Sequence, residues 1–300
     1  MNKETSIKLS AAIGAYIASS APTVEYTDGD IKKAYSSFTP EDLSEMKELG
    51  LLGDDFELFC VIRKFLSGIS LGGSADGEYI VGLFRNAKKL SADEFLRDRY
   101  ISDIHIPDVR IGNVFLTTAE YARGEIFCYD MPDFTGEAVY PKLGFFTRPV
   151  RFPAIYENNL PWVSVCPSEV NSMLPMIKAA HGKILVLGLG LGYYTYITSL
   201  SDKVEKITVV ELNKKIIDIF EKHILPQFSN SGKIRIIHAD AIAYLDSVED
   251  GDYDFCFADI WEGAVDGAPL YRKIKAHESR LPSTEFTYWI EDQIKAYIGK

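Results

Sequence analysis

Three carboxylates in the second half of the chain have the spacing of a ligand site. Glu211, Asp240 and Asp259 each come at the end of a short apolar run or two residues after it. Such runs are typical of buried parallel strands, whose carboxyl ends meet at one edge of an open sheet. A carboxylate at the second strand tip can accept both hydroxyls of a ribose, and one at the next tip can accept a hydrogen bond from an adenine amino group. The three runs are 206–210, 234–238 and 253–257.

A glycine cluster precedes these carboxylates. Gly188, Gly190 and Gly192 follow the apolar run 184–187 directly, and the segment 193–200 can begin a helix. Glycine lets the backbone turn sharply and approach a ligand that a Cβ atom would exclude. The free N–H groups at a helix start face such a ligand. Strand, loop and helix together predict a nucleotide cradle between about residue 182 and the end of the chain.

These motifs resemble those of the class I S-adenosylmethionine-dependent methyltransferases, and most of all their spermidine-synthase-like branch. Val186 stands where most of these enzymes have an acidic residue, and the branch also has an apolar residue there. The resemblance covers 162–257 well, extends loosely to Trp289 and does not include the residues before about 140. The segments that carry it are 167–169, 186–192, 210–211, 238–241 and 258–259.

The resemblance implies a fold and a set of ligand contacts. It implies that the glycine loop takes the methionine part of the cofactor, that Glu211 takes the ribose, and that Asp259 faces the reacting centre. Asp240 and Ala241 would take the adenine, and Glu169 would reach the cofactor's amino group. The candidate cofactor-binding residues are Gly188, Leu189, Gly190, Gly192, Tyr193, Glu211, Leu212, Asp240, Ala241 and Glu169, and the candidate catalytic residues are Asp259 and Trp261.

The glycine spacing separates two nucleotide classes. Loops that bind NAD or flavin dinucleotides have the pattern G-x-G-x-x-G. Here Gly192 comes one position early and Tyr193 stands at the place of the third glycine. The spacing G-x-G-x-G favours S-adenosylmethionine, while a dinucleotide or no cofactor at all remain alternatives.

The resemblance leaves the transferred group open. Aminopropyl transferases carry an acidic residue at the position of Leu191, where it meets the free amine of a decarboxylated cofactor. Leucine cannot pair with that amine, and burying an unpaired ammonium is costly. Backbone N–H groups can instead bind the carboxylate of the intact cofactor. We therefore favour methyl transfer to a small molecule. The alternatives are RNA or protein methylation, aminopropyl transfer and non-catalytic cofactor binding.

Two residues near the last carboxylate are candidates for the chemistry. Asp259 can act as a base when the acceptor carries a proton, or it can cap the following turn. Trp261 can stack on a flat or cationic acceptor, or it can belong to the core. The segment 259–261 lacks both prolines of the D-P-P-Y motif, so we predict no nucleic-acid base methylation from it. Further candidates for the acceptor pocket are Glu262, Asp266 and Tyr271.

Composition and charge exclude several classes of protein. The chain has 300 residues, 47% of them hydrophobic, and a net charge of −11. That charge disfavours a protein that mainly grips nucleic acid, including a helix-turn-helix reader. Four scattered cysteines without a C-x-x-C pair indicate reduced, buried thiols and a cytoplasmic protein without zinc. We expect an amphipathic helix rather than a signal peptide over 8–21, and no membrane-spanning segment elsewhere.

The chain divides by pattern into three parts. Residues 1–108 are predicted to be mainly helical, 109–166 to form a small β-rich unit, and 167–300 to form the Rossmann-like domain. Thr39-Pro40 predicts a helix start, and Gly50 its stop. The other predicted elements are helices at 54–66 and near 91–99, a loop at 70–77, strands at 111–116, 125–129, 143–146 and 162–165, and turns at 132–133 and 157–159.

The end of the chain departs from the resemblance. Only about 40 residues follow Asp259, too few for three more strands with their helices. We expect a helix over 269–275, a last helix capped by Ser283, and a shortened sheet. The exposed edge of such a sheet needs a cover, which the last helix, the N-terminal region or the second copy in a homodimer can supply.

Overall fold

The computed structural model describes residues 2–69, 75–133 and 138–299. The chain forms two compact units, one made of residues 1–96 and 120–151 and the other of 97–119 and 152–300. Strands β3 (Val114–Tyr121) and β6 (Val150–Glu157) contribute residues to both. The division into 1–108, 109–166 and 167–300 stays a prediction.

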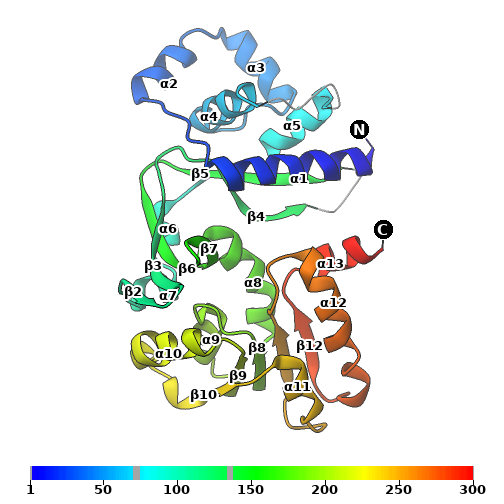
Figure 1. Cartoon of the computed structure of the whole chain (residues 1–300). Helices are drawn as coiled ribbons and strands as arrows, with labels where there is room; N and C mark the ends of the chain where they lie inside the picture. The colour runs from blue at the N-terminus through cyan, green and yellow to red at the C-terminus, as the bar shows by residue number, and fades with distance from the viewer. Residues whose placement is uncertain (1, 70–74, 134–137, 300) are drawn as a thin grey trace. The chain divides into compact units, whose positions relative to one another are not determined.

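The first unit is built largely from helices (Figure 1). Thr39 caps α3 through a reciprocal pair of hydrogen bonds with Asp42, as the Thr-Pro pair predicts. The helix over 8–21 is also confirmed, because α1 covers that segment. Part of the predicted loop 70–77 lies outside the described residues. The helices are α1 (Lys3–Ser20), α2 (Asp28–Tyr35), α3 (Pro40–Glu48), α4 (Phe56–Ser67), α5 (Gly77–Arg85) and α6 (Ala92–Phe95).

A three-stranded sheet completes this unit. Its order is β1-β5-β4, with β1 (Lys88–Leu90) parallel and β4 (Phe127–Asp133) antiparallel to the central β5 (Tyr140–Phe146). Residues of α1, α4 and α5 pack with β5 in one buried cluster. The turn predicted at 132–133 is wrong, because both residues continue β4. Pro132 is tolerated there since β4 is an edge strand with two register shifts.

The second unit begins with α7 (Arg99–Asp103) and contains a four-stranded sheet in the order β2-β3-β6-β7, whose pairs β2·β3 and β6·β7 are antiparallel. Strand β2 covers Val109–Ile111, and β7 covers Leu160–Ser164. The turn predicted at 157–159 is confirmed: Asn158 and Asn159 both have positive φ and join β6 to β7. Strand β6 was not predicted, because Pro153 interrupts its pattern.

A five-stranded parallel sheet forms the centre of the second unit and confirms the predicted Rossmann-like α/β fold. Its order is β10-β9-β8-β11-β12. Strand β8 lies in the middle with its last four residues fully buried, as the apolar run 184–187 requires. The strands are β8 (Gly182–Leu187), β9 (Val204–Glu211), β10 (Ile234–His238), β11 (Phe255–Ala258) and β12 (Glu285–Tyr288).

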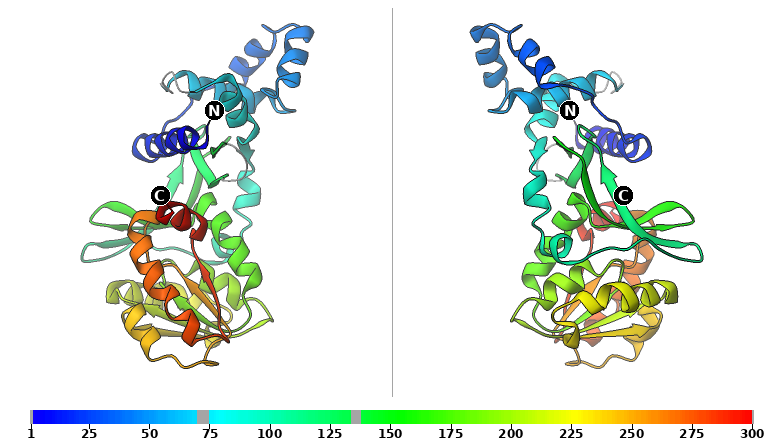
Figure 2. Two further views of the ribbon diagram at one scale, coloured as in Figure 1. Left: turned by 90° about the vertical axis from the view of Figure 1, so that its right-hand side faces the viewer. Right: turned by 90° about the vertical axis from the view of Figure 1, so that its left-hand side faces the viewer.

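Helices cover this sheet on two sides. In Figure 2, α12 and α13 face the viewer in the left-hand view and α10 faces the viewer in the right-hand view. Short turns η2 (Phe220–Ile224), η3 (Leu225–Gln227), η4 (Ser231–Lys233) and η5 (Glu278–Arg280) complete the connections. The helices are α8 (Pro167–Ala179), α9 (Tyr193–Ser199), α10 (Lys214–Ile219), α11 (Ala241–Asp246), α12 (Ala264–Lys275) and α13 (Glu291–Ile298).

The end of the chain corrects one prediction and refines another. The expected helix from Ser283 is wrong at its start: residues 285–288 form β12, parallel to β11, and α13 begins only at Glu291. The helical face seen in the sequence mixes strand residues with residues of α13. Within the described residues the sheet stops at this fifth strand, so it is shortened by less than expected. Helix α13 packs on α12.

The cysteines are more varied than predicted. Cys166 and Cys256 are buried, as expected, but Cys60 and Cys128 are only partly buried. All four are free thiols. None of the helices in the described ranges has both the length and the apolar composition needed to traverse a bilayer.

The start of β8 provides a test of the fold. Gly182 has φ +61°, and a Cβ atom on it would lie 2.2 Å from Asp254 Oδ2, which accepts a hydrogen bond from the Lys183 amide at 2.7 Å. We expect Gly182→Ala to destabilise the protein by about 2 kcal/mol or more, measured by urea denaturation. Gly232→Ala is the control, because Gly232 has neither a positive φ nor a neighbour within 4 Å of the added atom. Equal effects of the two substitutions would contradict this description of β8.

Candidate functional site

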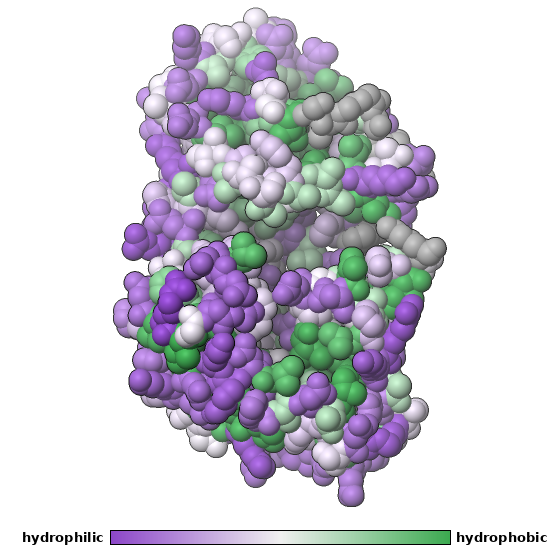
Figure 3. Space-filling model, viewed as in Figure 1, coloured by the Kyte–Doolittle hydropathy of each residue, from purple (hydrophilic) through white to green (hydrophobic). Residues whose placement is uncertain are grey.

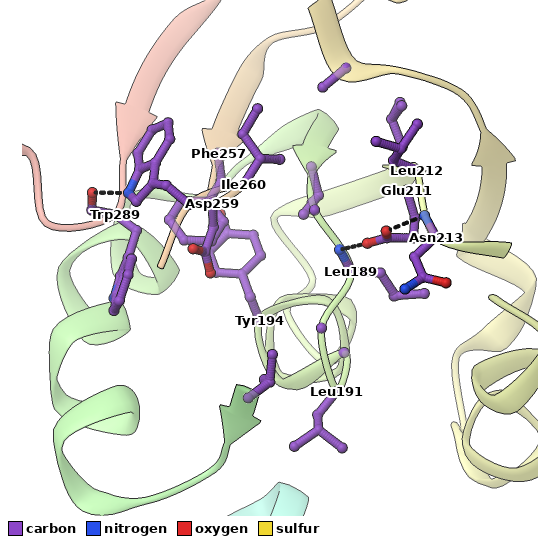
Figure 4. Close-up of a pocket in the computed structure, with 18 of the residues that line it drawn as sticks. Leu189, Leu191, Tyr194, Glu211, Leu212, Asn213, Phe257, Asp259, Ile260 and Trp289 are labelled. Carbon is purple, nitrogen blue, oxygen red and sulfur yellow. Dashed lines mark hydrogen bonds between the residues drawn. The ribbon is translucent and has the colours of Figure 1, made fainter. Parts of the chain in front are cut away.

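A cavity of about 530 Å³ opens at the carboxyl ends of the parallel strands. Figure 4 shows Asp259 and Trp289 toward one end of it, Glu211 and Leu212 toward the other, and Leu189 between them. In Figure 3, hydrophobic side chains gather on the part of the surface formed by the second unit. Every residue predicted to bind cofactor or do chemistry lines this cavity: Glu169, Gly188, Leu189, Gly190, Gly192, Tyr193, Glu211, Leu212, Asp240, Ala241, Asp259 and Trp261.

The glycine loop has a backbone that other residues cannot adopt. Gly188 has φ +99°, and a Cβ atom there would lie 2.0 Å from the carbonyl oxygen of Asp259. Gly192 has φ +74°, and its added atom would overlap the ring of Phe220 at 2.3 Å. The loop is closed by a hydrogen bond from the Gly192 amide to the Leu189 carbonyl at 2.8 Å. The glycines therefore allow the loop to pack closely against its neighbours and also leave room on the side of the cavity.

Glu211 connects the glycine loop to the second strand. Its Oε2 accepts a hydrogen bond from the Leu189 amide at 3.0 Å, and its Oε1 accepts one from the Asn213 amide at 2.7 Å. The side chain is buried, so these charge-assisted bonds fix its direction. Each carboxylate oxygen can accept more than one hydrogen bond, which leaves capacity for a ligand hydroxyl from the cavity.

The residues after β10 form the neighbouring part of the wall. Asp240 caps α11, because its Oδ1 accepts a hydrogen bond from the Ala243 amide at 2.9 Å. It is an exposed residue whose carboxylate lies at the cavity rim. Leu212 is 65% exposed, an unusual environment for a leucine that lines a cavity. An apolar ring placed between Asp240 and Leu212 would shield the Leu212 side chain from water.

Glu169 and Asp259 form an acidic pair at the other end. Glu169 stands in the first turn of α8, and Asp259 follows β11 directly. Burial raises the pKa of Glu169 to about 7. Burial also raises the pKa of Asp259 well above its ordinary value, and the nearby charge of Glu169 raises it further. Such a pair holds a proton near neutral pH and can exchange it with a ligand.

Tryptophan side chains make the wall beside this pair. The Trp261 indole donates a hydrogen bond to the Trp289 carbonyl at 3.3 Å, and the Trp289 indole donates one to Ser172 Oγ at 2.9 Å. Both rings are more than nine-tenths buried. Trp261 belongs to the core and also lines the cavity, and its stacking on an acceptor stays a prediction.

The three further acceptor-pocket candidates have different positions. Glu262 and Asp266 line the cavity, and Asp266 caps α12 by accepting hydrogen bonds from the amides of Glu262 and Gly263. Tyr271 is not among the lining residues. Its hydroxyl donates a hydrogen bond to Glu291 at 2.8 Å, within the contact between α12 and α13. Its placement in the acceptor pocket is therefore wrong.

The charged side chains that line the cavity are all acidic. Of the described residues that line it, none is Lys, Arg or His. Such a lining attracts cations and disfavours phosphate and other anions, since no positive side chain offsets the carboxylates. Its acidic residues are Glu169, Glu211, Asp240, Asp259, Glu262 and Asp266.

Several lining residues were not recognised from the sequence as part of the site. Trp162 and Val163 of β7 and Met173 of α8 belong to the wall. Val163 lies 3.3 Å from the position of an added Cβ atom on Gly190, so β7 passes over the loop. No spacing in the sequence relates β7 to the loop, because the contact is set by the tertiary fold.

Comparisons with known proteins give one family match. Residues 169–275 match the family model described as the spermine/spermidine synthase domain. No curated protein matches the chain. The chain is similar to a probable spermidine synthase from Corynebacterium glutamicum, with 17% identity over 37% of this chain and 45% of that one and a TM-score of 0.32.

Two other solved structures are similar at the same level. One is the spermidine synthase of Thermotoga maritima, with 16% identity, 48% of this chain and 57% of that one covered, and a TM-score of 0.34. The other is precorrin 8w decarboxylase of Methanobacterium thermoautotrophicum, with 21% identity, 43% and 67% covered, and a TM-score of 0.32. The chain thus spans about half the length of the two spermidine synthases. The family model confirms, over residues 169–275, the predicted resemblance to the spermidine-synthase-like branch of the class I S-adenosylmethionine-dependent methyltransferases.

Proposed function

We propose that the protein is an S-adenosylmethionine-dependent methyltransferase whose acceptor is a small neutral or cationic molecule. The observation that carries the proposal is the combination of a glycine loop with a cavity lining whose charged side chains are all acidic, at the ends of parallel strands. A sulfonium nucleoside is a cation, so it matches this lining. The pyrophosphate of NAD or of a flavin dinucleotide does not.

The residues present fit such a cofactor. We propose that Glu211 accepts the ribose hydroxyls, and that Asp240, Ala241 and Leu212 contact the adenine. In the part of the chain that the structure describes, no atom accepts a hydrogen bond from the amides of Gly190 and Leu191. Gly190 and Leu191 line the cavity beside Tyr193, so we propose that their amides bind the carboxylate of the cofactor.

The proposed chemistry depends on alignment and on one proton. When bound, the cofactor would supply an electrophilic methyl group. Trp261 and Trp289 exclude water and orient a flat or cationic acceptor. Asp259 takes the proton that the acceptor loses. Burial, and in addition the charge of Glu169, raise the pKa of Asp259 so that it can act as a base near neutral pH.

Aminopropyl transfer is the second candidate, and the family match favours it. Leu191 argues against it, because this buried residue cannot bind the amine of a decarboxylated cofactor. The acidic lining disfavours RNA as the acceptor. A cytoplasmic location and a homodimer remain part of this proposal.

One experiment separates the two transfers. The protein is incubated with a pool of small amines and either S-adenosylmethionine or its decarboxylated form, and the nucleoside product is identified by mass spectrometry. Methyl transfer yields S-adenosylhomocysteine and aminopropyl transfer yields methylthioadenosine. We expect the first product only. Methylthioadenosine formed from the decarboxylated nucleoside in an acceptor-dependent way would establish the second candidate instead.

Glu211 provides a test of the binding mode. We expect Glu211→Ala to weaken S-adenosylmethionine binding by roughly 100-fold in calorimetry, because two charge-assisted hydrogen bonds to the ribose are lost. Glu205→Ala is the matched control, since Glu205 lies on the same strand but is exposed and does not line the cavity. Equal affinities of the two variants would remove Glu211 from the site.

Asp259 and Glu169 provide a test of the proton transfer. We expect Asp259→Asn to lower kcat by roughly 100-fold or more, with little change in cofactor affinity. In the wild type, activity should rise with pH as the pair loses its protons. Glu169→Gln removes the charge that raises the pKa of Asp259, so the rise should move to lower pH. A pH–rate profile that Glu169→Gln leaves unchanged would show that the two groups do not act together.

A further inference from the structure

We infer that Tyr100 is a positioning residue for the glycine loop, although it does not line the cavity. Its hydroxyl donates a hydrogen bond to the carbonyl oxygen of Leu191. Tyr100 lies on α7, about 90 positions earlier in the chain, and no sequence motif connects it to the loop. The inference rests on the proposed function in that it takes the loop to be the cofactor's binding surface.

The bond from Tyr100 acts on one peptide group. The carbonyl of the Leu191–Gly192 peptide accepts from Tyr100, and the N–H of the same peptide donates to the Leu189 carbonyl at 2.8 Å. A peptide unit is planar, so a partner at each end fixes its rotation. Rotation of this unit would change the directions of the neighbouring loop amides, which we propose bind the cofactor's carboxylate.

The buried surroundings of Tyr100 leave its hydroxyl little alternative to the hydrogen bond with the Leu191 carbonyl. The side chain is fully buried, and its ring packs edge-on against Tyr193, Tyr196 and Phe228. Burial raises the pKa of the Tyr100 hydroxyl, so the group stays a proton donor at neutral pH. If the hydroxyl is removed, the buried Leu191 carbonyl loses this donor, and water cannot easily replace it.

The segment that carries Tyr100 is itself attached to α9. The Tyr193 hydroxyl donates to Asp98 Oδ2 at 3.0 Å, and the Tyr196 hydroxyl donates to Asp103 Oδ2 at 2.7 Å. Asp98 also caps α7 by accepting from the Tyr100 amide at 2.8 Å. Three tyrosine hydroxyls thus join α7 to the loop and to α9, but only that of Tyr100 reaches the loop backbone.

This arrangement provides a matched pair of variants. Tyr100→Phe and Tyr196→Phe each remove one tyrosine hydroxyl from the contact that joins α7 to the glycine loop and α9. Only Tyr100→Phe removes a hydrogen bond to the loop backbone. The readouts are S-adenosylmethionine affinity by calorimetry, stability to urea, and hydrogen exchange of the 188–193 amides by mass spectrometry. We expect Tyr100→Phe to bind about tenfold more weakly, because fewer molecules hold the competent loop. We expect Tyr196→Phe to stay within about twofold of wild type.

Hydrogen exchange of the loop amides tests the inference without any ligand. The 188–193 amides should exchange faster in Tyr100→Phe than in Tyr196→Phe at matched stability. The inference is overturned if Tyr100→Phe binds and exchanges like wild type, or if both variants lose affinity only in proportion to stability. If wild type binds no S-adenosylmethionine, the proposed function fails and exchange alone decides: unchanged exchange overturns the inference.

A milder variant covers the case in which Tyr100→Phe does not fold. Asp98→Ala keeps the Tyr100 hydroxyl but removes the cap of α7 and the partner of Tyr193. We expect Asp98→Ala to weaken S-adenosylmethionine binding, as Tyr100→Phe does, but by only about threefold. Wild-type affinity and loop exchange in Asp98→Ala would count against a positioning role for this segment.

Discussion

The site depends on the two hydrogen bonds that the Glu211 carboxylate accepts from backbone amides. One of its oxygens accepts a hydrogen bond from the glycine loop after β8, and the other accepts one from the amide of Asn213, which caps α10 after β9. It therefore joins the ends of two neighbouring strands at the edge where parallel sheets bind ligands. The same group that shapes the loop is the group proposed to hold the ribose, so the shape of the cavity and its proposed recognition of a nucleoside share one cause.

Charge gives the second constraint. The cavity gathers carboxylates from several strand ends and from α8, and no basic side chain among its described lining residues offsets them. Burial raises the pKa of both Glu169 and Asp259, and the nearby charge of Glu169 raises that of Asp259 further. A cationic ligand would relieve the cost of burying these charges, while an anionic ligand would add to it. Electrostatics thus restricts the class of ligand more narrowly than the fold does.

The sequence predicted which residues line the cavity better than it predicted the surrounding secondary structure. A glycine with positive φ and a carboxylate at the end of a strand are both visible in the local sequence pattern. Gly188, Glu211 and Asp259 could therefore be assigned to the cavity from the sequence alone. Strand β12 could not, because its residues also fit a helical face, and its pairing with β11 decided the outcome. Tyr100 could not be related to the loop either, since its role depends on a tertiary contact.

A crystal structure with S-adenosylmethionine bound would test the central claim most directly. Our account predicts the ribose hydroxyls within hydrogen-bonding distance of Glu211, and the sulfonium end toward Glu169 and Asp259. A nucleoside found outside this cavity, or held in it without contact to Glu211, would contradict the account.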